Sequence, residues 1–171
     1  MRIDSAEMKK INEIKDKVET DSGILDNVVD SIVKPYTKDL DKYILFIKDC
    51  LKDGENPPTT AELDDFVMNL STYIYFASGA CEHLGIRDDI SKSIYKEIYH
   101  SKRSELSHGT VADKDSIAEL ESMQEQLTNV AYNRAYKIMK AKVENAQELL
   151  SSCKKVLSHR IQEMSLTQIA N

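Results

Sequence analysis

The sequence is short of several features that particular protein classes need. Its 171 residues include no Trp, three Pro and five Gly, which is little punctuation for a fold of many short strands and turns. No apolar run approaches the roughly 18 residues that suggest a membrane span. The opening "MRIDSAEMKK" also lacks the apolar stretch of a signal peptide. These absences predict a soluble, cytoplasmic protein with no membrane partner.

Cysteine is scarce as well, and it is scattered. Cys50, Cys81 and Cys153 are odd in number, and each lies within an apolar helical pattern, so we expect core thiols. Glu97 and His100 form a single Glu-x-x-His, whereas a di-iron bundle needs two such motifs and two further Glu. No phosphate-binding loop, dinucleotide motif or zinc-protease motif is present. We therefore expect neither metal nor cofactor.

Charge is plentiful, and its distribution is uneven. Charged residues make up 30% of the chain and hydrophobic residues 41%, which is enough for a folded core. Residues 1–129 hold sixteen Lys/Arg and twenty-six Asp/Glu, whereas residues 130–171 hold seven and three. The net charge of −6 is therefore divided into −10 and +4. A polyanionic partner responds to such a basic segment more than to the total charge.

Apolar residues recur at helical spacing in the first part of the chain. Residues 11–18 predict a short first helix, and a second begins near Ile24, which Pro35 should break or kink. The segment "DGENPP", residues 53–58, predicts a loop. Thr59, with Glu62 three residues later, predicts a capping box at the start of the following helix.

Two glycines then suggest helix ends. Gly85 is expected to end the helix that begins at Thr59, and Gly109 to end the next one. From about Asp115 to Met164 the pattern predicts one long helix or two nearly continuous ones.

The long C-terminal segment keeps an apolar register of alternating four- and three-residue spacings over more than four heptads. This is more apolar length than a small bundle needs, which favours a contact between subunits of a homo-oligomer. One wall of a bundle within the chain is the alternative. The residues expected at the contact between subunits are Val143, Ala146, Leu150, Cys153, Leu157, Ile161 and Met164.

The expected fold is thus an all-α helical bundle with a long C-terminal helix that forms an oligomeric coiled seam. Residues 1–58 are expected to form an N-terminal helical arm and residues 59–109 a helical hairpin. Residues 110–171 are expected to form the long assembly helix, and residues 59–171 to fold as one unit.

The stretch "YHSKRSELSHG", residues 99–109, ends a helix with an apolar side and a basic side. Ile86, Ile90 and Ile94 share one face, and Lys92, Lys96 and Arg103 lie roughly opposite. Such a basic stripe suits phosphate binding, although a solvated polar face is the plain alternative. The candidate nucleic-acid-binding residues are Lys92, Lys96, Lys102 and Arg103, with Arg134, Lys137, Lys154 and Lys155 as a second stripe.

From about Asp65 onward, the chain resembles the UvsY-type recombination mediators of tailed phages. The resemblance rests on "YHSKRSEL", "GTVADK", "YNRAYKIMKAKVENA" and the ending "VLSHRIQEMSL". It implies a phage protein, acting in the cytoplasm of a bacterial host in DNA recombination and repair. Such a protein binds single-stranded DNA, displaces the single-strand-binding protein and helps to load a RecA-like recombinase. It also implies that Lys102 and Arg103 contact DNA and that the C-terminal helix assembles the subunits into a ring.

A second resemblance and a third function class stay open. The stretch "RSELSHG" resembles the Arg-x4-His signature of HEPN-domain ribonucleases, within residues 65–140. That resemblance implies metal-independent RNA cleavage, with His108 as general acid or base and Arg103 stabilising the phosphate. A helical scaffold or inhibitor that binds only proteins is the third class.

Overall fold

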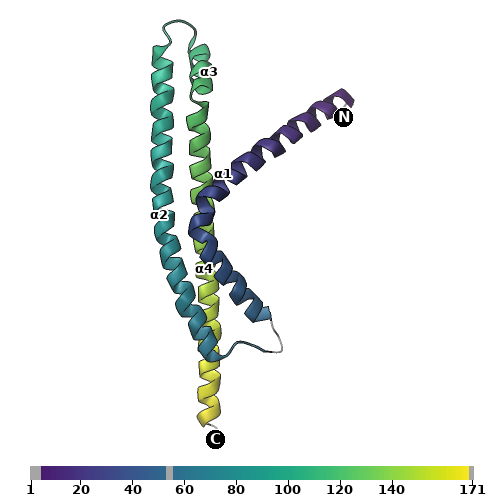
Figure 1. The fold of residues 1–171 in the computed structure, drawn as a ribbon, viewed down its shortest axis with the longest axis vertical. Coiled ribbons are helices and arrows are strands. Elements are labelled where there is room, and N and C mark those ends of the chain that lie inside the picture. The colour runs from purple at the N-terminus through teal and green to yellow at the C-terminus, as the bar shows by residue number, and fades with distance from the viewer. Residues whose placement is uncertain (1–4, 53–55, 170–171) are drawn as a thin grey trace.

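The computed structural model describes residues 5–52 and 56–169, and the all-α class is confirmed for them (Figure 1). The helices are α1 (Ser5–Lys52), α2 (Thr60–Glu105), α3 (Val111–Glu121) and α4 (Met123–Ile169). α2 and α4 run side by side as a long hairpin, and α3 continues the line of α4 at the hairpin tip (Figure 1). None of the described helices is long and apolar enough to cross a bilayer.

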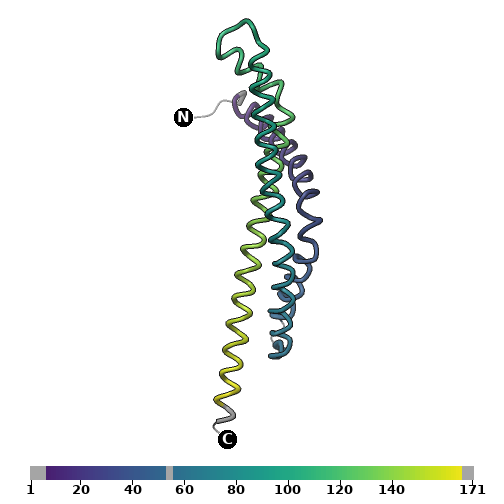
Figure 2. Tube along the Cα trace, turned by 90° about the vertical axis from the view of Figure 1, so that its left-hand side faces the viewer, coloured from purple at the N-terminus to yellow at the C-terminus, as the bar shows by residue number. Residues whose placement is uncertain are grey.

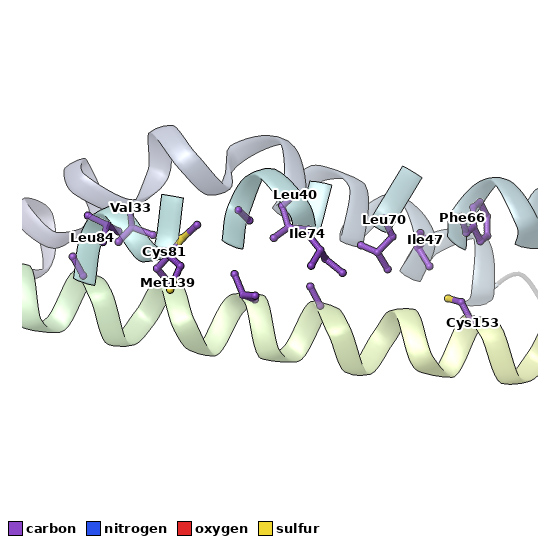
Figure 3. Close-up of a cluster of buried hydrophobic side chains, with 14 of the residues drawn as sticks. Val33, Leu40, Ile47, Phe66, Leu70, Ile74, Cys81, Leu84, Met139 and Cys153 are labelled. Carbon is purple, nitrogen blue, oxygen red and sulfur yellow. The ribbon is translucent and has the colours of Figure 1, made fainter. Parts of the chain in front are cut away.

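The core forms where the C-terminal half of α1 lies against the α2–α4 hairpin. Figure 3 shows side chains from the three helices pointing toward one another. Buried Ala131, Ala135 and Ala146 are small, and they let neighbouring helices approach α4 closely. The other buried residues of this core are Val29, Val33, Leu40 and Ile47 of α1, Leu63, Phe66, Leu70, Ile74, Ala77, Cys81 and Leu84 of α2, and Met139, Val143 and Cys153 of α4.

The three cysteines lie in or against this core. Cys81 and Cys153 are buried and Cys50 is half-buried, and all three are free thiols, so the core-thiol prediction is confirmed. Burial raises the pKa of the Cys81 and Cys153 thiols, which keeps them protonated and unreactive.

The first helix is longer than its sequence pattern suggested. α1 runs without a break from Ser5 to Lys52 through Pro35, so the prediction of two separate helices was wrong. Val33 and Thr37, on either side of the proline, are 3% and 1% exposed, and this packing carries the helix across it. The helix changes direction near its middle, as expected of a helix with an internal proline (Figure 1). Its N-terminal part consequently projects away from the hairpin (Figure 1).

α2 also passes through a residue that was expected to end it. Gly85 lies inside the helix, and a Cβ atom there would sit 3.3 Å from a ring carbon of Tyr136 on α4. The glycine therefore serves close packing between helices, and the prediction of a helix end was wrong.

The starts of α2 and α3 follow local capping chemistry. The backbone N–H of Thr59 donates to the Glu62 carboxylate at 2.7 Å and Glu62 N–H donates to Thr59 Oγ1 at 3.2 Å, which confirms the predicted capping box. Thr110 and Asp113 form a second box that opens α3. Gly109, with φ of 108°, lies in the loop just before it.

The C-terminal segment consists of two nearly continuous helices, which was one of the two predicted arrangements. The break is at Ser122, which is fully buried and whose hydroxyl donates to the Ala118 carbonyl at 2.7 Å. α4 then extends beyond the end of the hairpin (Figures 1 and 2).

The heptad register of α4 is largely used within the chain. Val143, Ala146 and Cys153 are buried in the core, and Leu150 and Leu157 pack against it while half-buried. Ile161 and Met164 are exposed. The contact between subunits stays a prediction, and the residues free to make it lie near the end of α4.

Candidate nucleic-acid interface

α1 covers one broad face of the α2–α4 hairpin and leaves the opposite face uncovered (Figure 2). On α4, Ala131 and Tyr132 line a groove of about 700 Å³ with α1, and Asn133 donates to Asp88 of α2 at 2.9 Å. At 100° per residue, Lys137 therefore projects on the side away from α1, whereas Arg134 lies seven residues after the groove residue Leu127 and so on nearly the same side of α4 as that residue.

The same reasoning places the basic residues of α2. Ile90 and Ile94 line a groove toward the side of α1, and Asp88 bonds to α4. Lys92 and Lys96 occupy the remaining sector, which faces the same way as Lys137. The fold therefore places Lys92 and Lys96 of the first predicted stripe and Lys137 of the second on one surface, which we call the open face.

The basic side chains of the open face are available for a partner. Lys92, Lys96 and Lys137 are exposed, as is Arg134 outside this face, and none of the four forms an ion pair with another described residue. Sequence reasoning missed Lys140, which is also exposed and lies on this face one turn beyond Lys137. Its three-residue spacing from Lys137 was the signal that could have identified it.

The hydrogen bond between Asn133 and Asp88 is a reference point from which the length of the open face can be estimated. Lys92 and Lys96 lie on the tip side of this contact, and Lys137 and Lys140 lie on the other side. With a rise of 1.5 Å per residue, the stretch from Lys96 to Lys140 spans roughly 20 Å along the hairpin.

Lys154 and Lys155 belong to a separate part of α4. Both are exposed, but Glu144 and Glu148 lie between them and Lys140 along the helix. Lys155 shares a shallow depression with these two glutamates. The predicted second stripe is thus divided into a basic part near Lys137 and a part near Lys155 that carries charges of both signs.

The hairpin tip holds Lys102 and Arg103 in ion pairs. The Arg103 side chain donates to Asp115 of α3, and the Tyr99 hydroxyl donates to the same carboxylate at 3.1 Å. Lys102 Nζ lies 3.6 Å from a carboxylate oxygen of Glu121 on α3 and 3.8 Å from one of Glu105. These contacts fasten α3 to the end of α2.

The charges at the tip stabilise one another. The hydrogen bond from Arg103 lowers the pKa of Asp115, and the same bond raises the pKa of Arg103. Desolvation, followed by the hydrogen bond to Asp115, raises the pKa of Tyr99. Both ions are thus held in their charged forms next to a neutral phenol.

Arg103 and His108, the pair of the ribonuclease prediction, lie in different surroundings. His108 is exposed in the loop between α2 and α3, and Arg103 is bound to Asp115. Among the described residues, no hydrogen bond or ion pair joins the two side chains. General acid–base catalysis would require the pair to converge on one phosphate.

Comparison of the chain with known protein families, curated protein sequences and solved structures found no match. Within residues 5–52 and 56–169, no three His, Cys, Asp or Glu side chains gather in a way that could hold a metal ion. The geometry of the open face is therefore the main guide to function.

Proposed function

We propose that this protein binds single-stranded DNA through the open face and acts as a recombination mediator. The observation that supports this most is the set of basic residues without ion pairs on the uncovered side of the hairpin. In a chain with a net charge of −6, this face keeps its positive charge while the tip neutralises its own. An exposed row of Lys and Arg is the usual electrostatic footprint for a phosphate backbone.

The expected binding mode follows from the same residues. Lysine side chains contact phosphates as point charges, so binding carries little base information and falls steeply with salt. Asp89, Glu144 and Glu148 lie near the basic residues and weaken the contact made by one subunit. Several subunits acting on one strand would recover affinity through multivalency.

Lys102 and Arg103 take a secondary part in this proposal. Their ion pairs are partly exposed, and such pairs are weak enough to exchange a carboxylate for a phosphate. Their first task is to hold the tip together. The mediator role itself, with a RecA-like recombinase and a single-strand-binding protein as partners, rests on the resemblance of residues 65–171 to UvsY-type proteins.

Two linked assays test the proposal. The first measures fluorescence anisotropy of a labelled oligothymidine at low salt. The second measures the ATPase activity of a RecA-like recombinase on DNA precoated with single-strand-binding protein. We expect the wild-type chain to bind and to stimulate, and the Lys92→Glu/Lys96→Glu variant to lose both. Binding without stimulation would remove the mediator role, and no binding at low salt would favour a scaffold that binds only proteins.

The ribonuclease alternative is tested on the same preparation. RNA cleavage in the presence of a chelator, lost in His108→Ala by two to four orders of magnitude, would replace our proposal with the HEPN-like one. We expect no cleavage, because Arg103 is bound to Asp115.

A further inference from the structure

α2 is apolar on two opposite sides. Its core side is buried against α1 and α4, while a second row of large apolar residues is exposed on the opposite side of the helix. The last residue of this outer row, Ile90, also lines the edge of a groove with Tyr132 of α4. An exposed row of large apolar residues on a helix often marks an interaction surface. The exposed fractions in this outer row are 64% for Met68, 75% for Tyr75, 68% for Phe76, 56% for Ile86 and 53% for Ile90.

The outer row is large enough for a subunit interface. A fully exposed aromatic side chain offers roughly 150–250 Å², and Met and Ile somewhat less, so the row exposes on the order of 600 Å² of apolar surface. Two copies packed through it would bury on the order of 1,200 Å², within the range of specific protein–protein interfaces. This area is at the upper end of the range for the largest apolar patch of a monomer, about 300–600 Å², and such patches are often functional.

Gly79 lies in the middle of this row. A Cβ atom built on Gly79 would meet nothing within 4 Å, so packing inside the chain does not require a glycine there. Glycine also weakens an exposed helix relative to alanine. A second helix that crosses at Gly79 would explain it, because the missing side chain lets two backbones approach.

Two pairs of positions on this side of α2 are symmetric about Gly79, whereas Tyr75 and Phe76 correspond to His83 and Glu82. Met68 and Ile90 lie eleven residues before and after it, and Thr72 and Ile86 lie seven residues before and after it. If two copies of α2 cross antiparallel at Gly79, Met68 meets the partner subunit's Ile90, and Thr72 meets the partner subunit's Ile86. A parallel arrangement would instead pair each residue with itself.

Charge also favours the antiparallel arrangement. Residues 60–86 hold four Asp/Glu and no Lys/Arg, whereas residues 87–105 hold five Lys/Arg and four Asp/Glu. Antiparallel packing places the acidic half of each α2 beside the half that carries the basic residues. Parallel packing would place the two acidic halves together.

We propose that two copies of this chain pair antiparallel through the outer row of α2, with a two-fold axis close to Gly79. The axis is perpendicular to the plane of each hairpin, so both open faces point to the same side. If the open face binds DNA, which rests on the function proposed above, the pair offers one strand a surface twice as wide.

The oligomeric mass of two matched glycine variants tests the pairing without DNA. Gly79→Glu adds a side chain and a like charge at the axis, and Gly23→Glu makes the same change on α1, where a Cβ also meets nothing within 4 Å. Both changes replace an exposed helical glycine by a better helix former, so both variants should fold. We expect the wild type and Gly23→Glu to share one mass at micromolar concentration and Gly79→Glu to have half of it. A monomeric wild type, or an unchanged mass for Gly79→Glu, would overturn the proposal.

Cysteine cross-linking tests the direction of pairing. We expect an equal mixture of Met68→Cys and Ile90→Cys chains to form a disulfide-linked dimer under mild oxidation. Each variant alone should form none beyond the wild-type background of native thiols. Cross-linking of Met68→Cys with itself would show parallel packing and overturn the antiparallel proposal. Because neither test includes nucleic acid, the pairing and the proposed DNA binding can fail separately.

Discussion

At the scale of single residues, a few polar contacts decide which faces of the hairpin are covered. Lys142 of α4 donates to both carboxylate oxygens of Asp41 on α1, each at 2.6 Å. Thr37, only 1% exposed, donates to the same carboxylate at 2.9 Å. This group holds α1 on one side of the hairpin, and the open face remains on the other.

Removing Asp41 tests how much this group contributes. We expect Asp41→Ala to lower the free energy of unfolding by about 1–2 kcal/mol, because a partly exposed ion pair is lost and the buried Thr37 hydroxyl loses its acceptor. Lys34→Ala removes an exposed ion pair with Asp30 and should change the free energy of unfolding by less than about 0.5 kcal/mol. Urea denaturation of both variants measures the difference, and equal effects would contradict this role for Asp41.

The hairpin tip predicts a pH dependence. Arg103 lowers the pKa of Asp115, so the charged carboxylate favours the folded state. This contribution is present above the ordinary carboxyl pKa, near 4, and is lost as the pH falls through the lower folded value. We expect the melting temperature of the wild type to fall more between pH 5 and pH 3 than that of Asp115→Asn. If the melting temperatures of the two proteins fell equally between pH 5 and pH 3, the result would contradict a stabilising ion pair at the tip.

At the scale of elements, the sequence predicted helices well and their ends unevenly. The spacing of apolar residues and the Thr59 capping box identified where helices lie, because both signals are local. Pro35 was predicted to break or kink its helix, and α1 runs through it with a change of direction. Gly85 was misread because tertiary packing overrides its local preference: Tyr136 occupies the space beside it. The heptad register of α4 identified which residues of the helix are buried. It did not show what covers them, which is largely α1 and α2 of the same chain.

The two sides of α2 should respond differently to truncation. Leu70 is fully buried, so we expect Leu70→Ala to lower the free energy of unfolding by about 2–5 kcal/mol. Tyr75 on the outer row is 75% exposed, so Tyr75→Ala should change monomer stability by less than about 0.5 kcal/mol. Denaturation at low protein concentration, where any oligomer dissociates, measures both. A large loss in Tyr75→Ala would mean that the outer row packs inside the chain.

The end of α4 can be tested for the predicted contact between subunits. Ile161 and Met164 are exposed, so Ile161→Glu/Met164→Glu should leave the helical content unchanged. If these residues join subunits, the variant should have a lower sedimentation mass than the wild type, since buried glutamates are strongly unfavourable at an interface. An unchanged mass would remove the end of α4 from the oligomer contact.

At the scale of the whole molecule, the candidate site combines predictable and unpredictable parts. Exposed Lys92, Lys96 and Lys137 could be named from helical periodicity alone. Their placement on one face depends on where α1 packs, which no local pattern encodes. Likewise, the partners of Lys102 and Arg103 lie on α3, and only the fold of the tip brings those carboxylates close.

The salt dependence of single-stranded DNA binding tests the central claim most directly, if measured on two charge-matched variants. Lys92→Glu/Lys137→Glu reverses two charges on the open face, and Lys38→Glu/Lys42→Glu reverses two exposed charges on α1. Because each phosphate contact contributes about 0.7 to the slope of log affinity against log salt, we expect the first variant to lose about 1.4 from the slope. The second should keep the wild-type slope. Equal losses in both variants, or no binding by the wild type at low salt, would contradict a DNA-binding open face.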